Sequence, residues 1–267
     1  MKTPIDAAAQ LAITTLTSRA PEATELASLF KSAGYKLALV GGPVRDAILG
    51  RLGNDLDFTT DAHPKDCEKI LNKWADSVWD IGAAFGTVAG KKGEITVEVT
   101  TYRSESYDNT SRKPNVEFGK TIEGDLARRD FTINAMALEL TTPEPTFIDL
   151  FNGVGDLQNK LIKTPGKAEE SFSDDPLRMM RGARFASQLG FEIEPATFAA
   201  MTAMAERIEI ISAERVQTEF VKLMLGAHPR RGLEALVDSG LAQRVLPELP
   251  ALKLEVDEHH HHKDVYE

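Results

Sequence analysis

The stretch LALVGGPVRDAILGRLGNDLDF, residues 37–58, combines two adjacent glycines, an arginine and an Asp-x-Asp pair. The apolar run before Gly41 predicts a strand, and Pro43 after Gly42 is typical of the first turn of a helix. Glycines in such a turn let a ligand approach the backbone, and the amides at a helix start favour phosphate oxygens. Arg45 adds a positive charge there. The turn is therefore a candidate phosphate site, although a turn that only connects two elements has the same pattern.

The Asp-x-Asp pair, Asp55 and Asp57, falls on a predicted strand. Side chains two residues apart on a strand share a face, so both carboxylates converge while Leu56 points into the core. Like charges held this close raise each other's pKa unless a cation neutralises them. Mg²⁺ suits such oxygen ligands and binds one or two carboxylates together with substrate phosphates. The pair predicts a Mg²⁺ site, and an exposed turn beside Gly53 and Asn54 is the alternative.

A third acid lies in EITVEVTTYR, residues 94–103, where strand alternation places the two valines on one face and Glu98 on the other. Two strands that offer three acids could hold one or two Mg²⁺ ions for in-line phosphoryl transfer. Asp55, Asp57 and Glu98 are therefore candidate catalytic residues. A solvent-facing Glu98 on an edge strand is the alternative.

Composition and charge limit the classes of protein to which this chain can belong. The chain has 267 residues, of which 42% are hydrophobic and 27% charged, as expected for a soluble protein with two compact units. The N-terminal stretch AAAQLAITTL predicts neither a secretory signal nor a membrane span, so we expect a cytoplasmic location. A lone cysteine, Cys67, excludes an intrachain disulfide. The formal charge of −10 argues against a surface coated for nucleic-acid binding, although a local basic groove remains compatible with it.

The hydrophobic pattern changes once along the chain. Residues 1–34 predict two short helices split near Pro21, and residues 35–165 alternate short β-branched runs with helical stretches. After Pro176 only a helical period remains. The sequence therefore predicts an α+β fold: a mixed sheet with helices, followed by an all-helical part.

Two further motifs carry charged residues at informative spacings. In RRDFTINA, residues 128–135, the residues alone favour a charged cap before a helix formed by FTINAMAL. In DDPLRMMRGARF, residues 174–185, the three arginines spread over a helix face about 120° wide, while Leu177, Met180 and Phe185 serve the core. Such an arginine row is typical of a solvated face.

The ordered motifs, taken together, resemble a known family. LVGGPVRDAILGRLGNDLDFTTDAHP is followed by FGTVAG with VEVTTYR, by GDLARRDFTINAMAL, by FIDLFNGVGDLQNKLIKT and by SDDPLRMMRGARFASQLGF. The series is similar, in order and approximate spacing, to tRNA nucleotidyltransferases and bacterial poly(A) polymerases, the second class of the DNA polymerase beta superfamily. The resemblance covers roughly residues 37–225. Within the family, the pattern is most similar to enzymes that add CCA to the 3′ end of tRNA.

The resemblance implies a domain order and a set of partners. It implies a helical extension at 1–34, a polymerase-beta-like nucleotidyltransferase head at 35–165, a helical neck and body at 166–255 that bind nucleotide and RNA, and the start of a truncated HD-type domain at 256–267. The implied reaction is template-independent addition of C and A from CTP and ATP, with Mg²⁺ as cofactor and the tRNA 3′ end as partner. It implies no membrane partner and leaves the oligomeric state open.

The resemblance also implies a role for each candidate residue. Asp55 and Asp57 would bind Mg²⁺, and Glu98 would act on the primer 3′-hydroxyl. Residues expected to hold the triphosphate, sugar or base are Gly41, Gly42, Arg45, Arg129, Asp130, Asn134, Asp175, Arg178, Arg181 and Arg184. Among them, Asp130 would accept from the ribose 2′-hydroxyl, and the pair of Asp175 and Arg178 would read the edge of C or A. Asp174 stands where family members usually have Glu.

Several alternatives stay open on sequence alone. Residues 103–118 resemble a mobile loop used in switching from C to A addition, or form an ordinary surface loop. The run His259–His262 resembles the entry to an HD-type domain, and a free metal-binding histidine cluster is the alternative. A relative that adds only C, only A or a poly(A) tail fits the same motifs. A truncated, inactive nucleotide- or RNA-binding module is the alternative of another class.

Overall fold

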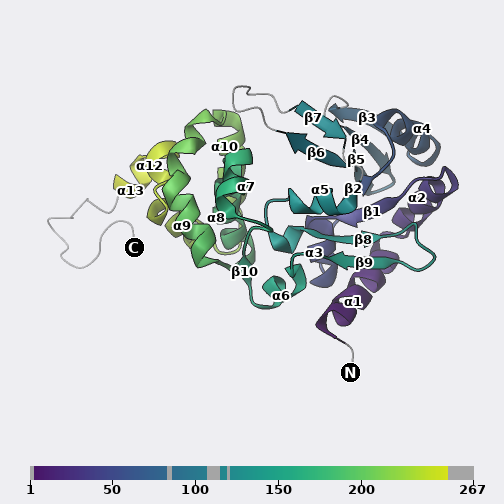
Figure 1. Ribbon diagram of the computed structural model, residues 1–267, viewed down its shortest axis with the longest axis horizontal. Coiled ribbons are helices and arrows are strands. Elements are labelled where there is room, and N and C mark those ends of the chain that lie inside the picture. Colours follow the sequence, from purple (N-terminus) through teal and green to yellow (C-terminus); the bar gives the residue numbers. More distant parts are fainter. Residues whose placement is uncertain (1–2, 83–85, 107–114, 119–120, 252–267) are drawn as a thin grey trace. The chain divides into compact units, whose positions relative to one another are not determined.

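The computed structural model describes residues 3–82, 86–106, 115–118 and 121–251. The chain divides into two compact units, Met1–Leu157 and Gln158–Glu267. The first unit is built on a sheet and the second is mainly helical (Figure 1). The centre of the 103–118 segment and the histidine run both lie outside the described residues. No helix in the described ranges is long and apolar enough to cross a membrane.

The first unit contains a seven-stranded mixed sheet in the order β3-β4-β5-β2-β1-β8-β9 (Figure 1). Its strands are β1 (Leu37–Val40), β2 (Asp55–Thr60), β3 (Ser77–Gly82), β4 (Thr87–Lys92), β5 (Ile95–Thr101), β8 (Met136–Glu139) and β9 (Thr146–Asp149). Only β2 and β5 run parallel, and every other neighbouring pair in this sheet is antiparallel. The mixed sheet with helices that the sequence predicted is confirmed.

Helices and a short hairpin complete the unit. They are α1 (Pro4–Arg19), α2 (Pro21–Ser32), α3 (Gly42–Ile48), α4 (Pro64–Trp74), α5 (Ile122–Ala127), the 3-10 helix η2 (Thr132–Asn134), α6 (Gly153–Gln158), and the antiparallel pair β6 (Arg103–Ser106) and β7 (Asn115–Phe118). The predicted pair of N-terminal helices split near Pro21 is confirmed, and Thr3 closes a capping box on α1. α1 contacts α3, and α2 contacts β1 and α4, so both helices belong to the sheet unit.

The segment after Asp130 differs from the helix that the residues alone favoured. Residues 132–134 form one 3-10 turn, and residues 136–139 form β8, between β1 and β9. Residues 131–138 are all buried. A strand covered on both faces needs a continuous apolar run without alternation, and such a run cannot be told from a buried helix by periodicity. The helix-cap interpretation is therefore wrong.

The packing of helix α5 determines where the charged segment after it lies. Ile122 and Leu126 of α5 pack with Val40 of β1 and Ala137 of β8. The arginines that follow α5 therefore lie near the end of β1, where the glycines begin.

The second unit packs its helices around one apolar core. They are α7 (Ala168–Asp174), α8 (Leu177–Leu189), α9 (Pro195–Met204), η3 (Ala205–Ile210), α10 (Ala213–Met224), α11 (Pro229–Asp238), α12 (Ala242–Val245) and α13 (Glu248–Ala251). Phe172, Met180, Met201, Leu223 and Leu236 are fully buried at its centre. A two-residue parallel pair joins β10 (Leu161–Ile162) to β11 (Glu192–Ile193), which follows α8 after the left-handed Gly190.

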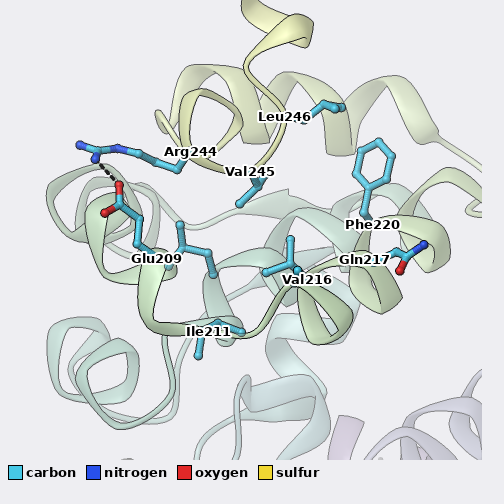
Figure 2. A pocket seen from close by; sticks show the side chains of 10 residues that line it. Glu209, Ile211, Val216, Gln217, Phe220, Arg244, Val245 and Leu246 are labelled. Carbon is cyan, nitrogen blue, oxygen red and sulfur yellow. Dashed lines mark hydrogen bonds and ion pairs between the residues drawn. The ribbon is translucent and has the colours of Figure 1, made fainter.

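Figure 2 shows a groove of about 450 Å³ in this second unit. Its lining comes from η3, α10 and α12 and is largely apolar, with Val216, Phe220 and Val245 among the side chains. An ion pair between Arg244 and Glu209 closes one side. None of the nucleotide-binding residues predicted from the sequence lines this groove.

Candidate active site

The three predicted acids meet on the parallel pair of strands. Asp57 of β2 stands in register with Glu98 of β5, and Asp55 lies two residues before Asp57 on the same face. The three acids are exposed, whereas Leu56 is 1% exposed. The prediction that Leu56 packs inside while its neighbours share the other face is confirmed. Because strand register fixes these positions, the carboxylates face the same solvent-accessible site.

The charge of Asp57 is held in an unfavourable setting. The protein around its carboxyl group removes part of the hydration and raises the pKa of Asp57 to about 6, and the negative charges of Glu98 and Asp55 act in the same direction. The positive charge of Arg129 opposes the shift. A bound cation would favour the ionised form of Asp57, so this site suits a positive ligand.

The donor set fits a hard divalent cation that shares its ligands with a substrate. In the described ranges no three His, Cys, Asp or Glu side chains are arranged to hold a metal by themselves. Asp55 and Asp57 supply two carboxylates on one strand face, and Mg²⁺ commonly binds through one or two carboxylates plus phosphate oxygens. A metal here would therefore complete its coordination shell with oxygens that the protein does not provide.

The glycine turn lies where β1 ends and α3 begins. Gly41 has a φ of 73°, which L side chains rarely adopt. A Cβ at Gly41 would also lie 2.9 Å from Nη1 of Arg129. The sequence analysis expected a ligand to approach the backbone here, and the structure places the Arg129 guanidinium against the same glycine. Gly41 is thus required both by its backbone and by its neighbour.

Arg45, Asp130 and Asn134 form one buried network. Nη1 of Arg45 donates to Oδ1 of Asn134 at 2.6 Å, and Nδ2 of Asn134 donates to Oδ1 of Asp130 at 3.0 Å. Asp46 accepts from Nε and Nη2 of Arg45 at 3.1 and 2.9 Å. The amide of Phe131 donates to the same Asp130 oxygen at 2.8 Å. The structure therefore joins the glycine turn to the RRDFTINA segment through side chains.

Sequence reasoning missed Asp125, which is 0% exposed. Its two oxygens accept from Nη2 of Arg128 at 3.1 Å and from Nη2 of Arg129 at 3.0 Å. Burial alone would raise the pKa of Asp125, but the charges of Arg129 and Arg128 outweigh burial, so the pKa lies below its usual value. The signal was present in GDLARRD, because Asp followed by Arg at i+3 and i+4 is helical ion-pair spacing.

In the second unit, Asp175 and Arg178 are held by separate partners. Oδ1 of Asp175 accepts from the amide of Leu177 at 3.2 Å, and Oδ2 accepts from Nη2 of Arg215 at 3.1 Å. Nη1 of Arg178 donates to Oγ of Ser171 at 2.9 Å. Arg178 is 8% exposed, so the solvated arginine row that the spacing alone suggested is wrong at this position.

The other two arginines of α8 share one acid. Arg181 and Arg184 approach Glu219 of α10 through their Nε atoms at 3.4 and 3.1 Å. Glu219 is buried, and a buried carboxylate needs such partners to stay ionised. Sequence reasoning did not identify Glu219 or Arg215 as partners, because both lie on α10, far along the chain from the residues that they pair with. Arg215 is 40 positions from Asp175, and Glu219 is 38 positions from Arg181.

A mixed sheet that presents paired carboxylates beside a glycine turn is the arrangement expected for a polymerase-beta-like nucleotidyltransferase head. Residues 37–163 match the family described as Poly A polymerase head domain. Residues 190–252 match the family described as Probable RNA and SrmB-binding site of polymerase A. The chain belongs to the family of tRNA nucleotidyltransferases and bacterial poly(A) polymerases. Nucleotidyltransferases of this family generally need a divalent metal ion.

Individual relatives agree with this placement. A CCA-adding enzyme of Streptococcus suis is 43% identical over 235 residues, which cover 88% of this chain and 56% of the relative. One of Limosilactobacillus fermentum is 43% identical over 230 residues, covering 86% and 56%. The chain thus spans a little over half the length of the curated relatives that it matches.

Solved structures of CCA-adding enzymes are also similar to this chain. The structure of the Bacillus stearothermophilus CCA-adding enzyme in complex with CTP is 36% identical, with a TM-score of 0.72 over 90% of this chain and 53% of that one. The Thermotoga maritima CCA-adding enzyme complexed with tRNA is 26% identical, with a TM-score of 0.70 over 84% and 52%.

Proposed function

We propose that this chain is the nucleotidyltransferase part of an enzyme that adds C and A from CTP and ATP to the 3′ end of tRNA. The observation that carries the proposal is the register of β2 and β5, which sets Asp57 opposite Glu98 with Asp55 on the same face. Relatives at 43% identity are CCA-adding enzymes, which supports this choice of reaction. We assign 1–34 as a helical extension, 35–165 as the head and 166–255 as the neck and body.

In this proposal the first unit binds the triphosphate and performs the transfer. Asp55 and Asp57 would hold Mg²⁺, which would neutralise phosphate charge and so favour attack by the primer hydroxyl. Glu98 orients the primer 3′-hydroxyl and accepts its proton as the oxygen bonds to the α-phosphorus of the nucleotide and pyrophosphate leaves. The Arg129 guanidinium beside Gly41 and the buried Arg45 supply fixed positive charge for the triphosphate.

Sugar and base recognition follow from the remaining polar groups. We assign the Asp130 carboxylate, which Asn134 and the amide of Phe131 hold in place through Oδ1, to the ribose 2′-hydroxyl. In the second unit, Asp175 accepts from the exocyclic amino group of C or A, and Arg178 donates to a ring nitrogen or carbonyl. Arg181 and Arg184, which lie on α8 with Arg178, add positive charge to the nucleotide-binding face of that helix. The structures of relatives with CTP and with tRNA are consistent with these substrates.

Extension of defined tRNA ends tests the proposal. The chain is incubated with Mg²⁺, labelled CTP or ATP, and three tRNAs whose 3′ ends lack CCA, lack CA or lack only the final A. Addition of C followed by A supports the proposal. Addition of one nucleotide only, or of repeated A, identifies a C-only, A-only or poly(A)-adding relative. No extension, combined with measurable binding of CTP, identifies a nucleotide-binding module without activity.

Asp55→Ala tests the assignment of the carboxylates. We expect extension to fall at least a thousandfold, because the pair loses one of its two metal-binding groups, while the thermal midpoint stays close to that of the parent because Asp55 is exposed. Glu94→Ala, an exposed acid in the turn before β5, is the matched control and should keep parent activity. Activity near the parent level in Asp55→Ala would remove the metal assignment.

We also infer that the protein works in the cytoplasm. The single cysteine, Cys67, is buried and free, which agrees with a reducing compartment. Fractionation of cells that express the natural gene, followed by immunodetection, would test this location.

A further inference from the structure

Asp125 is the most deeply buried acid next to the candidate active site, and it holds two arginines. Its side chain is 1% exposed, and the side chains of Arg128 and Arg129 are 23% and 22% exposed. One carboxylate between two guanidinium groups leaves a net charge of +1 in the cluster. A buried acid with two such partners is costly to disturb, because loss of the acid leaves two like charges side by side.

The two arginines differ in what lies beyond Asp125. Nη1 of Arg129 lies 2.9 Å from the position that a Cβ would take on Gly41, so this guanidinium rests against the glycine turn. Nε of Arg129 and Nε of Arg128 are both buried and neither makes a hydrogen bond among the described residues, so the contact with Gly41 is what distinguishes Arg129. A buried donor without a partner is rare, and it marks a place where a ligand oxygen would gain a charge-assisted bond. The bond to Asp125 uses only Nη2, so the ligand and the acid do not compete for one donor atom.

We propose that Asp125 is a positioning residue, which holds the Arg129 guanidinium against the Gly41 turn so that the net positive charge of the cluster meets the nucleotide's triphosphate. The inference rests on the proposed function, since it assumes that the turn receives a triphosphate. It adds a reason for the glycine at position 41: the empty space there is needed by an arginine of the chain as well as by the ligand.

The role predicts a loss that depends on the phosphates. We expect Asp125→Asn to weaken CTP binding about tenfold, because a mobile Arg129 must be ordered again when the triphosphate binds. Cytidine, which lacks phosphates, should bind within about twofold of the parent value, measured by its displacement of labelled CTP. Arg129→Ala should show the same split, and the double variant Asp125→Asn/Arg129→Ala should lose no more than Arg129→Ala alone.

Arg128→Ala is the matched control. Arg128 is equally exposed and pairs with the same acid, but it is not the arginine that rests against Gly41. CTP affinity within about twofold of the parent in this variant supports the proposal, and a tenfold loss overturns it.

The remaining outcomes distinguish a failure of the positioning role from a failure of the proposed function. Unchanged CTP affinity in Asp125→Asn, or equal losses for CTP and cytidine, overturns the positioning role while leaving the proposed function intact. If Asp125→Asn does not fold, as its thermal melt would reveal, the contrast between Arg129→Ala and Arg128→Ala decides the matter. No CTP binding by the parent chain overturns both the proposed function and this inference.

Discussion

Asp57 carries the least favourable charge in the site, and its titration should appear in the stability of the fold. Its pKa is about 6 in the folded chain, against 3.8 for an ordinary aspartate. Between these two values the folded chain keeps a proton that the unfolded chain has released. The free energy of unfolding therefore falls as pH rises from about 4 to about 6, and the contribution is fully lost above that range.

Asp57→Asn should remove this pH dependence. Because the Asp57 side chain keeps contact with solvent, we expect the variant to exceed the parent at pH 7.5 by about 1 kcal/mol, less than the full pKa shift represents. Urea denaturation from pH 4 to 8 in EDTA, which removes divalent cations, measures the profile. Glu94→Gln is the control and should follow the parent. A parent profile that rises between pH 4 and 6, with no difference from Asp57→Asn, would contradict the prediction.

At the scale of elements, the crossing of α11 with α8 and α10 depends on one glycine. A Cβ on Gly232 would lie 2.7 Å from Cγ of Leu223 and 2.9 Å from the carbonyl oxygen of Ala183. The leucine can shift, but the carbonyl belongs to the backbone of α8 and cannot. The close approach of these helices therefore requires a residue without a side chain at this position.

Gly232→Ala should destabilise the second unit. Alanine gains about 1 kcal/mol of helix propensity over glycine, and overpacking against a fixed backbone costs up to about 3 kcal/mol, so we expect a net loss of about 2 kcal/mol. Gly166→Ala is the control, because a Cβ there meets nothing within 4 Å. Urea denaturation of both variants measures the difference, and equal stability of the two would show that the helices separate without cost.

Local pattern was sufficient for some elements and insufficient for others. The period-2 pattern around Asp55 and Glu98 predicted two strands and the face of each acid, because one side of each strand is solvated. β8 was missed, because a strand buried on both faces has no alternation to detect. Its apolar residues fit a helix equally well until the neighbouring strands are known.

In the candidate site, too, local pattern was sufficient for some features and insufficient for others. The candidate residues were found from motifs, but the network that joins them was not, because Arg45 bonds to a residue 89 positions away. Such pairings are decided by the order of strands in the sheet, which side-chain periodicity does not contain. Asp125 is the exception, since its spacing from Arg128 and Arg129 lies within one helical turn and could have been recognised.

For the molecule as a whole, charge limits how firmly it would hold the tRNA that the proposed function requires. The formal charge is −10, so contact with phosphates must come from local basic groups. Arginines of the second unit are already engaged by acids: Arg181 and Arg184 by Glu219, Arg230 by Glu234 and Arg231 by Glu192. A phosphate that binds one of these arginines must compete with a carboxylate, which reduces the gain from each contact.

We therefore expect weak tRNA binding that depends strongly on salt. At about 150 mM salt the dissociation constant should be on the order of 1 to 100 μM, the range of non-specific binding, and affinity should fall steeply between about 50 and 200 mM. Filter binding across this salt range measures both quantities. The Streptococcus suis CCA-adding enzyme, of which this chain covers 56%, is the comparison under the same conditions. Nanomolar binding by the present chain at physiological salt would contradict the prediction, and would mean that carboxylates such as Glu219 release their arginines to the RNA at little cost.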